Sequence, residues 1–490
     1  MNILGISAGY HDAAISVIDQ HGDILFAGHS ERYSKIKNDP NLSLSLLHEI
    51  THLQIGHIAY YERPWAKQLR QLYSKQGIEW DKITTKKILV GQIGKQFSAF
   101  PNEFISSYNH HLSHAAAGFQ TSSFDRATVV VIDAIGEWDT ISIWGAEYIN
   151  GKAKYKRLWR QLYPKSIGLF YTAMTKRIGF TPGEDEYILM GMSAYGKPSI
   201  AGFLKKDLMD SGSNLHKGVP NDYMSEFGPE DLAASTQEVA EMLICEVMER
   251  ARNYKWSTNL VYGGGVALNC VANRRLGEYF DNIWIMPNPG DAGSSLGAAA
   301  LAYGGRVNFR SAFLGHNIPG AYPVRGAIAG LTARQIVGVS NGRAEFGPRA
   351  LGNRSLLADP RGGKIKEIIN DIKQRQQFRP FAPVILEELC DQYFDMPHGW
   401  NNSRYMSVVA RCRAPDLFPA IVHRDGTSRV QTCPADGSGI RRLLEEWHAL
   451  TGCPMLLNTS LNIKGQPMVN TEQDALDWQN HYGIPVAIRD

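Results

Sequence analysis

Two similar strand–turn–strand patterns constrain the fold of this chain more than any other feature of its sequence. The first covers residues 2–18 and the second covers residues 129–144. In each, an apolar β-prone run ends at a polar turn, and a second apolar run follows. Ser7 and Asp133 occupy the same place in the two patterns, 126 residues apart. The matched loop lengths predict an internal duplication.

The rest of the N-terminal half alternates between helical and strand patterns. From about residue 160 to residue 250, apolar residues recur at helical spacing. Two further strands are predicted at residues 259–262 and 283–286, and each ends in a glycine-rich turn. These elements place the chain in the α/β class.

The segment 304–328 separates two predicted domains. It holds several glycines and prolines and little periodicity, so it is predicted to be a linker. A first domain then spans residues 1–303, and a second domain of mixed helix and strand spans residues 329–490. The length of 490 residues fits two large domains or about three ordinary ones.

The composition excludes several classes of protein. The chain is 43% hydrophobic and 20% charged, which excludes a disordered chain, a collagen-like repeat and a coiled-coil rod. Lys and Arg number 51 against 48 Asp and Glu, a net charge of +3. A strongly basic nucleic-acid coat is therefore absent, and only a local basic groove remains open.

The cysteines and the hydropathy indicate a cytoplasmic protein. The six cysteines lie at least 20 residues apart, so no CxxC motif exists and reduced thiols are expected. Residues 1–18 have no basic region ahead of their apolar run and are not expected to be a signal peptide. No run of 18 apolar residues occurs, so no membrane partner is expected.

Two histidines and two aspartates form a candidate metal site. On a helix, His110 and His114 are one turn apart and share a face. Asp133 and Asp291 each follow an apolar strand, where a carboxylate is costly unless it is paired. Two nitrogens and two oxygens suit iron, zinc or manganese better than calcium. Alternatively, the aspartates cap turns or hold a Mg²⁺–nucleotide.

Two glycine-rich turns are candidates for phosphate binding. They cover residues 263–269 and 291–297 and precede predicted helices. Small residues let backbone N–H groups approach a phosphate, and a helix N-terminus favours negative charge. Neither turn has the Walker or the GxGxxG spacing, and each alone also fits a packing turn. Together with the duplicated hairpins, they indicate an actin/sugar-kinase-like ATPase core.

The second domain is dense in arginines that neighbour small polar residues. Arginine beside Gly, Pro, Ser and Asn suits bidentate recognition of phosphate, whereas a solvated basic face is richer in Lys and Glu. Each arginine taken alone also fits a structural salt bridge. The candidates for phosphate chemistry are Arg349, Arg354, Lys373, Arg379, Arg429, Ser460 and Asn462.

Eight ordered motifs resemble the nodulation-protein-U and cephamycin-type O-carbamoyltransferases. The resemblance runs from Gly5 to about Thr471. It implies an actin/sugar-kinase-like N-terminal domain, similar to the tRNA threonylcarbamoyl transferase, and a YrdC-like C-terminal domain. It also implies two steps: carbamoyl adenylate forms from carbamoyl phosphate and ATP, and the carbamoyl group passes to an acceptor hydroxyl. The motifs are HHLSHAAAGF, VVVIDAIGEW, YGGGVALN, NPGDAGSSLGAA, EFGPRALGNRS, FRPFAPVIL, SRVQT and LNTSLNIKGQP.

The resemblance assigns roles to individual residues. It implies ATP with Mg²⁺, carbamoyl phosphate as co-substrate, and a resident metal that is usually iron. His11 and Asp12 match a motif near the acceptor, and His11 is the expected base. The implied metal ligands are His110, His114, Asp133 and Asp291; Lys373, Arg379, Arg429, Ser460 and Asn462 are implied for carbamoyl phosphate and the adenylate; Gly264, Gly265, Asn269 and Gly293 lie in the glycine-rich turns.

The chain departs from the family pattern in a few places. It is short for the family, which suggests trimmed loops around the acceptor pocket. Arg404 stands where a proline is expected, and Leu461 stands where phenylalanine is usual. Gln374 lies in a segment that is often more basic. These differences bear on the acceptor and on fine kinetics more than on the reaction class.

The acceptor and the partners stay open at this point. A sugar or natural product and the hydroxymethyl group of a pyrimidine, in a nucleotide or in DNA, are both compatible with the family. The basic stretch 152–165 fits a nucleic-acid acceptor but also fits a solvated face. A homodimer is open as well. The rival functions are a tRNA threonylcarbamoyl-type transferase and a non-catalytic ATP-binding regulator of the same fold.

Overall fold

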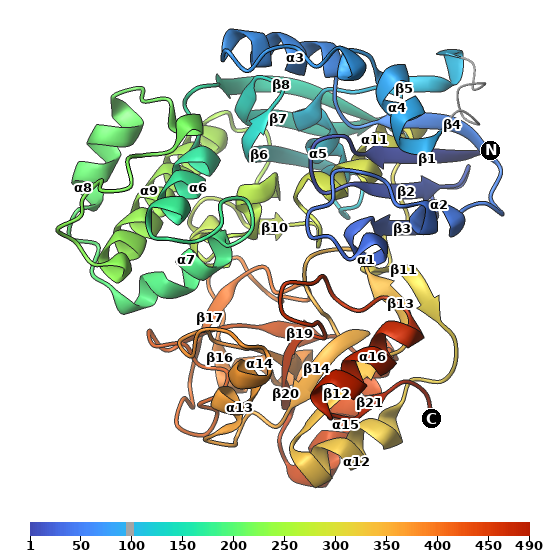
Figure 1. The fold of residues 1–490 in the computed structure, drawn as a ribbon, viewed down its shortest axis with the longest axis vertical. Helices are drawn as coiled ribbons and strands as arrows, with labels where there is room; N and C mark the ends of the chain where they lie inside the picture. The colour runs from blue at the N-terminus through green and yellow to red at the C-terminus, as the bar shows by residue number, and fades with distance from the viewer. Residues whose placement is uncertain (95–101) are drawn as a thin grey trace.

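The computed structural model describes residues 1–94 and 102–490 and shows two N-terminal sheets above a C-terminal domain (Figure 1). The first sheet has the strand order β3-β2-β1-β4-β5. Neighbouring strands in the β1–β2–β3 meander are antiparallel, whereas β4 and β5 join in parallel. Its strands are β1 (Asn2–Ser7), β2 (Ala14–Ile18), β3 (Ile24–His29), β4 (Ile55–Tyr60) and β5 (Ile105–Ser107).

The second sheet repeats this topology, which confirms the predicted duplication. Its order is β8-β7-β6-β9-β10, so each strand has a counterpart in the first sheet. The meander is again antiparallel and the last two strands are again parallel. The duplicated α/β core agrees with the actin/sugar-kinase-like expectation. Its strands are β6 (Arg126–Gly136), β7 (Asp139–Ile149), β8 (Lys152–Leu162), β9 (Asn259–Gly263) and β10 (Asn282–Trp284).

Two helices pack between the sheets and exchange sides. Helix α5 (His110–Phe119) follows the first sheet but lies on the second, and α11 (Ser294–Tyr303) follows the second but lies on the first. The helices touch each other closely, because a Cβ on Gly297 would lie 1.9 Å from the Ser113 carbonyl oxygen. This contact joins the helix that carries the histidine motif to the turn that carries Asp291.

Other helices surround the sheets. The predicted helical region is confirmed, although β8 occupies its first residues. Its longest helix, α9, begins with Pro229 at the first helical position and carries acidic residues in its first turn and arginines in its last turn, as the helix dipole favours. The N-terminal helices other than α5 and α11 are α1 (Glu31–Ser34), α2 (Leu44–His48), α3 (Pro64–Tyr73), α4 (Thr85–Ile93), α6 (Ile167–Arg177), α7 (Glu186–Met192), α8 (Ala201–Leu204), α9 (Pro229–Asn253) and α10 (Cys270–Asn273).

The C-terminal domain is α+β, as expected. A six-stranded sheet has the order β19-β15-β20-β14-β12-β21, and a three-stranded sheet has the order β16-β17-β18. The core consists mainly of Val, Ile and Leu from the large sheet and its helices. The elements are α12 (Val324–Arg334), β12 (Ile336–Ser340), β13 (Gly342–Glu345), β14 (Arg354–Ala358), α13 (Ile365–Ile372), β15 (Ala382–Leu386), α14 (Cys390–Tyr393), β16 (Phe394–Asp395), β17 (Val409–Cys412), β18 (Thr427–Arg429), β19 (Gln431–Cys433), α15 (Gly439–Thr451), β20 (Met455–Ser460), α16 (Glu472–Tyr482) and β21 (Val486–Ala487).

The segment 304–328 is more ordered than the linker predicted from its glycines and prolines. It contains β11 (Phe313–Ile318), which pairs with β13, and the first turn of α12. Its first residues are held by the N-terminal domain, because the backbone of Val307 donates to the Gln120 carbonyl. The sequence pattern did not predict β11, because the strand is short and is flanked by glycine and proline.

The cysteines and the helices bear on two further features of the chain. All six cysteines are free and buried. Among the described residues, no helix combines the length and the apolar character that crossing a bilayer requires.

Candidate active site

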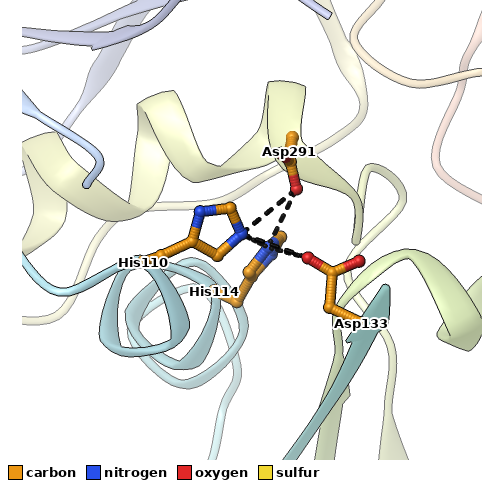
Figure 2. A group of neighbouring side chains, drawn as sticks. All are labelled: His110, His114, Asp133 and Asp291. Atoms are coloured by element: carbon orange, nitrogen blue, oxygen red, sulfur yellow. Dashed lines mark hydrogen bonds and ion pairs between the residues drawn. The ribbon is translucent and has the colours of Figure 1, made fainter. Parts of the chain in front are cut away.

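His110, His114, Asp133 and Asp291 meet in one buried cluster (Figure 2). Asn109 caps α5 and starts the helix at His110, so both rings leave the same helix face. The His110 Nε2 atom lies 3.1 Å from the His114 Nε2 atom and 3.1 Å from an Asp133 oxygen. Asp291 Oδ1 lies 3.3 Å from the His110 Nε2 atom and 3.2 Å from the His114 Nε2 atom. The four ligand atoms all lie within 4.8 Å of one another.

This donor set fits a divalent transition metal. Four ligands bound tetrahedrally at about 2.0–2.2 Å lie about 3.3–3.6 Å apart. Most distances within the cluster are close to that range. Two imidazole nitrogens and two carboxylate oxygens suit iron, zinc or manganese.

The groups of the cluster hold one another in charged forms. Burial favours the neutral imidazole, but the Asp291 carboxylate outweighs it and raises the pKa of His110 well above its usual range. Burial also favours the neutral carboxyl, yet His110 and His11 keep the pKa of Asp291 well below its usual range. The carboxylates therefore place negative charge where a cation would be held.

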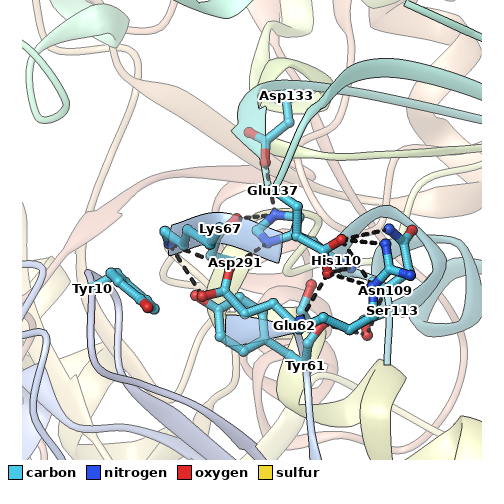
Figure 3. Close-up of polar contacts among 12 residues, drawn as sticks. Tyr10, Tyr61, Glu62, Lys67, Asn109, His110, Ser113, Asp133, Glu137 and Asp291 are labelled. Carbon is cyan, nitrogen blue, oxygen red and sulfur yellow. Dashed lines mark hydrogen bonds and ion pairs between the residues drawn. The ribbon is translucent and has the colours of Figure 1, made fainter. Parts of the chain in front are cut away.

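A second layer of polar groups orients the two histidines, and Figure 3 shows the part of it around His110. Glu62 follows β4 and is fully buried, and its Oε2 atom lies 3.3 Å from His110 Nδ1. Lys67 of α3 is buried beside Glu62, with the ammonium 3.2 Å from Glu62 Oε1. The Oγ atom of Ser294 lies 3.1 Å from His114 Nδ1. With each Nδ1 occupied, both Nε2 atoms are left for a metal.

His11 and Asp12 lie in the turn between β1 and β2, beside this cluster. The His11 Nε2 atom lies 3.3 Å from an Asp291 oxygen, and its Nδ1 atom lies 3.1 Å from an Asp12 oxygen. Desolvation favours the neutral ring, but Asp291 and Asp12 outweigh it and raise the pKa of His11 to about 9. The turn thus places a titratable ring at the edge of the candidate metal site.

One large cavity joins the His/Asp cluster to the C-terminal domain. Its volume is about 1190 Å³, enough for more than one small ligand. His11, Asp12, Asp133 and Asp291 line it from the N-terminal domain. From the C-terminal domain it is lined by the predicted residues Arg349, Lys373, Arg379, Arg429, Ser460 and Asn462.

The C-terminal side of the cavity carries cations that lack acidic partners. Burial and the Arg429 guanidinium lower the pKa of Arg349 to about 9. Burial, Arg375, Arg379 and Lys37 lower the pKa of Lys373 well below its usual range. Within residues 1–94 and 102–490, no carboxylate forms an ion pair with Arg349, Lys373 or Arg429. Crowded cations without counter-ions are the arrangement expected where a polyanion binds.

Lys373 is held in place by residues of the last predicted motif. Its ammonium donates to the Ser460 carbonyl and to Asn462 Oδ1, both at 2.7 Å. Ser460 ends β20, and its hydroxyl also reaches Asn462 Oδ1 at 2.8 Å. Arg379 lies over the Tyr187 ring, 4.7 Å from its centroid. These contacts leave both cations facing the cavity.

Five predicted residues do not line the cavity: His110 and His114, which are buried within the His/Asp cluster, and Arg354, Gly264 and Gly293. Arg354 is fully buried, and its guanidinium donates to five backbone carbonyls, so it differs from its predicted phosphate role. The reason is that β14 lies inside the large sheet, between β12 and β20. Gly264 and Gly293 have tight backbone environments: their Cβ atoms would lie 2.2 Å from the Ile132 carbonyl oxygen and 1.8 Å from the Asn288 carbonyl oxygen, respectively.

The other residues of the first glycine-rich turn do reach the cavity. Gly265 lines it, and the Gly265 amide lies 3.4 Å from an Asp133 oxygen. Asn269 also lines it, and its side chain caps α10 and bonds Gln237. This turn therefore lies beside the His/Asp cluster.

Several residues at the site escaped the sequence analysis. Glu62 and Lys67 have no motif around them. Arg375 lies in a predicted cationic segment but was not singled out; its guanidinium stacks on the Phe381 ring, and its Nη2 atom is buried without a partner. The signal that could have found Arg375 is its place between Lys373 and Arg379, which puts three cations within seven residues.

Comparisons with known proteins match both domains. Residues 66–300 match the family model described as carbamoyltransferase N-terminus, and residues 328–488 match the one described as carbamoyltransferase C-terminus. Nodulation protein U of Sinorhizobium fredii is 33% identical, over 76% of this chain and 75% of the relative. The chain belongs to the carbamoyltransferase family. This carbamoyltransferase is also 32% identical to an uncharacterized Synechocystis protein, over 97% of this chain and 93% of the relative.

Solved structures resemble the carbamoyltransferase only distantly. One is the activator of the 2-hydroxyisocaproyl-CoA dehydratase from Clostridium difficile with bound ADPNP, at 15% identity. The alignment covers 62% of this chain and 94% of that chain, with a TM-score of 0.35. A likeness at this level carries no conclusion about fold or ligand. The matched family segments, in contrast, each contribute one side of the large cavity.

Proposed function

We propose that this carbamoyltransferase makes carbamoyl adenylate from carbamoyl phosphate and ATP, and then transfers the carbamoyl group to an acceptor hydroxyl. One observation carries the proposal: the two aspartates of the His/Asp cluster and the unpaired cations line the same cavity. A shared enclosed space suits a reactive acyl adenylate, because passage inside the protein limits its hydrolysis.

The cation cluster serves the first step. Carbamoyl phosphate and ATP, which arrives with Mg²⁺, are both polyanions, so fixed positive charges must offset their repulsion. Lys373, Arg379 and Arg429 line the cavity for this purpose. Neighbouring cations lower the pKa of Lys373 because they repel its ammonium form. An anion that binds among them offsets this repulsion and therefore interacts strongly with the ammonium.

The first step takes place in two stages. Water cleaves the bond between the carbamoyl group and phosphate, which gives carbamate and inorganic phosphate. A carbamate oxygen then attacks the α-phosphorus of ATP, and the bond to the β-phosphate breaks. The products are carbamoyl adenylate and pyrophosphate.

The transfer step belongs to the N-terminal side of the cavity. The acceptor oxygen attacks the carbamoyl carbon and AMP leaves. The neutral form of His11 takes the hydroxyl proton, with Asp12 orienting its Nδ1 atom. A divalent metal held by His110, His114, Asp133 and Asp291 would act as a Lewis acid on a carbonyl or phosphate oxygen. Iron, zinc and manganese all suit this donor set.

The acceptor class has two candidates. One is a sugar or natural-product hydroxyl, and the other is the hydroxymethyl group of a pyrimidine in a nucleotide or in DNA. For the second, support comes from β8, whose lysines and arginines are mostly exposed along an edge strand. Charged residues also protect edge strands from pairing, so both candidates belong in the test.

The test is pyrophosphate release from purified protein with ATP, Mg²⁺ and carbamoyl phosphate. An acceptor panel of hydroxymethylcytosine nucleotides, DNA and aminosugars is then screened by mass spectrometry for replacement of H by CONH₂. We expect release that depends on carbamoyl phosphate and one carbamoylated acceptor class. Folded, metal-loaded protein that releases no pyrophosphate with any acceptor would overturn the proposal.

Two variants separate the steps. Lys373→Met is expected to abolish pyrophosphate release, because it removes a cation from the first step. Asp291→Asn is expected to retain release and lose transfer, because it changes the metal cluster. His11→Ala with full release and an unchanged transfer rate would contradict the role of His11.

A further inference from the structure

Arg32 is a buried arginine of α1 whose hydrogen bonds are incomplete. Its guanidinium is only 3% exposed, and its Nη2 atom donates to the Gly347 carbonyl at 2.8 Å. The Nε and Nη1 atoms are buried without a hydrogen-bond partner. The nearest carboxylate oxygen, on Glu31, lies 3.5 Å from Nε. Buried donors of a charged group rarely stay unsatisfied, so an acceptor is missing from this position.

The unsatisfied guanidinium lies at the cavity, where the two domains meet. Arg32 lines the cavity together with His29 and Asn288. Its partner Gly347 packs against the loop that leads to Asp291, since a Cβ there would lie 3.8 Å from the Asn288 Cβ. Gly347 also precedes Arg349 of the cation cluster by two residues. Arg32 therefore stands between the metal cluster and the cation cluster.

Lys37 supplies a second positive charge on the same side. It lines the cavity, and among the described residues it has no ion-pair partner. Its loop is tied to the C-terminal domain, because the Lys35 ammonium lies 2.5 Å from an Asp474 oxygen. The loop also holds the turn of His11, because the Asp12 amide donates to the Asn38 carbonyl at 3.3 Å. Lys37 is thus placed between the expected base and the C-terminal cations.

We propose that Arg32 and Lys37 bind a phosphate group at the N-terminal wall of the cavity, next to the C-terminal cations. A free N–H group of the guanidinium can donate to an oxyanion, and the ammonium adds a point charge. The neighbouring His29 adds no positive charge, because burial and Arg32 lower its pKa to about 3. The phosphate comes from one of two sources, the adenylate or a phosphorylated acceptor. Naming these sources rests on the proposed function.

Direct binding tests the site without any turnover. Inorganic phosphate and AMP are titrated by calorimetry into full-length Lys373→Met protein, in which the C-terminal cluster is weakened. We expect both probes to bind, and Arg32→Met or Lys37→Met in that background to weaken binding about tenfold or more. Arg310→Met is the matched control, because Arg310 is 83% exposed and pairs with Asp23 outside the cavity.

The variants are chosen so that misfolding does not decide the result. Arg32→Lys keeps the charge, and Lys37→Met removes a side chain without a partner, so both are expected to fold. Unchanged phosphate and AMP affinity in folded Arg32→Lys and Lys37→Met proteins would overturn the proposal. Because binding is measured without ATP or carbamoyl phosphate, a wild type that releases no pyrophosphate refutes only the proposed function.

A kinetic arm identifies the source of the phosphate. If it belongs to the adenylate, Arg32→Lys raises the apparent KM for ATP in pyrophosphate release or slows transfer to every acceptor equally. If it belongs to the acceptor, the same variant slows transfer to a phosphorylated acceptor more than to its dephosphorylated form. Kinetics identical to the wild type in all of these assays would contradict a phosphate site at Arg32.

Discussion

Glu62 Oε2 lies 3.3 Å from His110 Nδ1, on the side of the ring away from the Nε2 atom that contacts Asp133. The carboxylate is buried and is paired with Lys67. This arrangement matches the outer-shell carboxylates that orient metal-binding histidines. The relationship makes Glu62 a positioning residue, although it touches neither the cavity nor a substrate.

We predict that Glu62→Gln weakens metal binding about 10- to 100-fold, because the amide is a weaker partner for His110 Nδ1. The double variant with Lys67→Met avoids leaving the Lys67 ammonium unpaired and is expected to bind equally weakly. Cobalt affinity, measured by visible absorption with a competing chelator, checks both. Glu226→Gln, at an exposed position, is the control, and wild-type cobalt affinity in the double variant would refute the role of Glu62.

Gly297→Ala is predicted to disturb the metal cluster from a distance. The new Cβ would lie 1.9 Å from the Ser113 carbonyl oxygen, so α11 must move away from α5. Overpacking of this kind costs about 1–3 kcal/mol of stability. Thermal unfolding and cobalt affinity should therefore both decline. Gly202→Ala is the matched control, because its Cβ would meet nothing within 4 Å; equal behaviour of the two variants would contradict the prediction.

The affinity for carbamoyl phosphate is predicted to fall as pH rises. Burial and neighbouring cations lower the pKa of Lys373, so its ammonium loses its proton at a lower pH than an ordinary lysine. Anion binding favours the ammonium, so binding takes up a proton above that pKa, and Kd rises up to tenfold per pH unit. Calorimetry in two buffers of different ionisation enthalpy measures how many protons are taken up on binding. A constant Kd and no proton uptake from about pH 7 to about pH 10 would contradict this.

Arg354 and Arg349 are predicted to behave differently although they lie in one motif. Arg354→Met removes the donor to five carbonyls and should cost about 3 kcal/mol or more of stability. Arg349→Met should weaken ATP binding and leave the melting temperature unchanged or higher, because it removes a cation that Arg429 repels. Differential scanning fluorimetry with and without ATP compares them. Equal loss of stability in both variants would show that Arg349 is structural as well.

The local elements were predictable because they depend on short-range backbone periodicity. Apolar β-prone runs on either side of a polar turn predicted both hairpins, and the matched turn lengths predicted a duplication, which the two sheets show by sharing one topology. The spacing of His110 and His114 placed both rings on one helix face, which is a property of any helix. The ordered motifs identified the family and, through it, the aspartates and most of the cations that meet at the cavity.

Tertiary packing decided the rest, because contacts between distant segments leave no local period. Asp133 and Asp291 reach the histidines because α5 and α11 exchange sides between the sheets. Arg354 turned inward because its strand lies within the sheet, whereas Arg32, from a four-residue helix, turned out to line the cavity. The sequence alone determined the strands, the helices and the kinds of side chain available. Only the packing of the two domains determined which charges meet and which are left without a partner, because burial and long-range contact are properties of the folded chain.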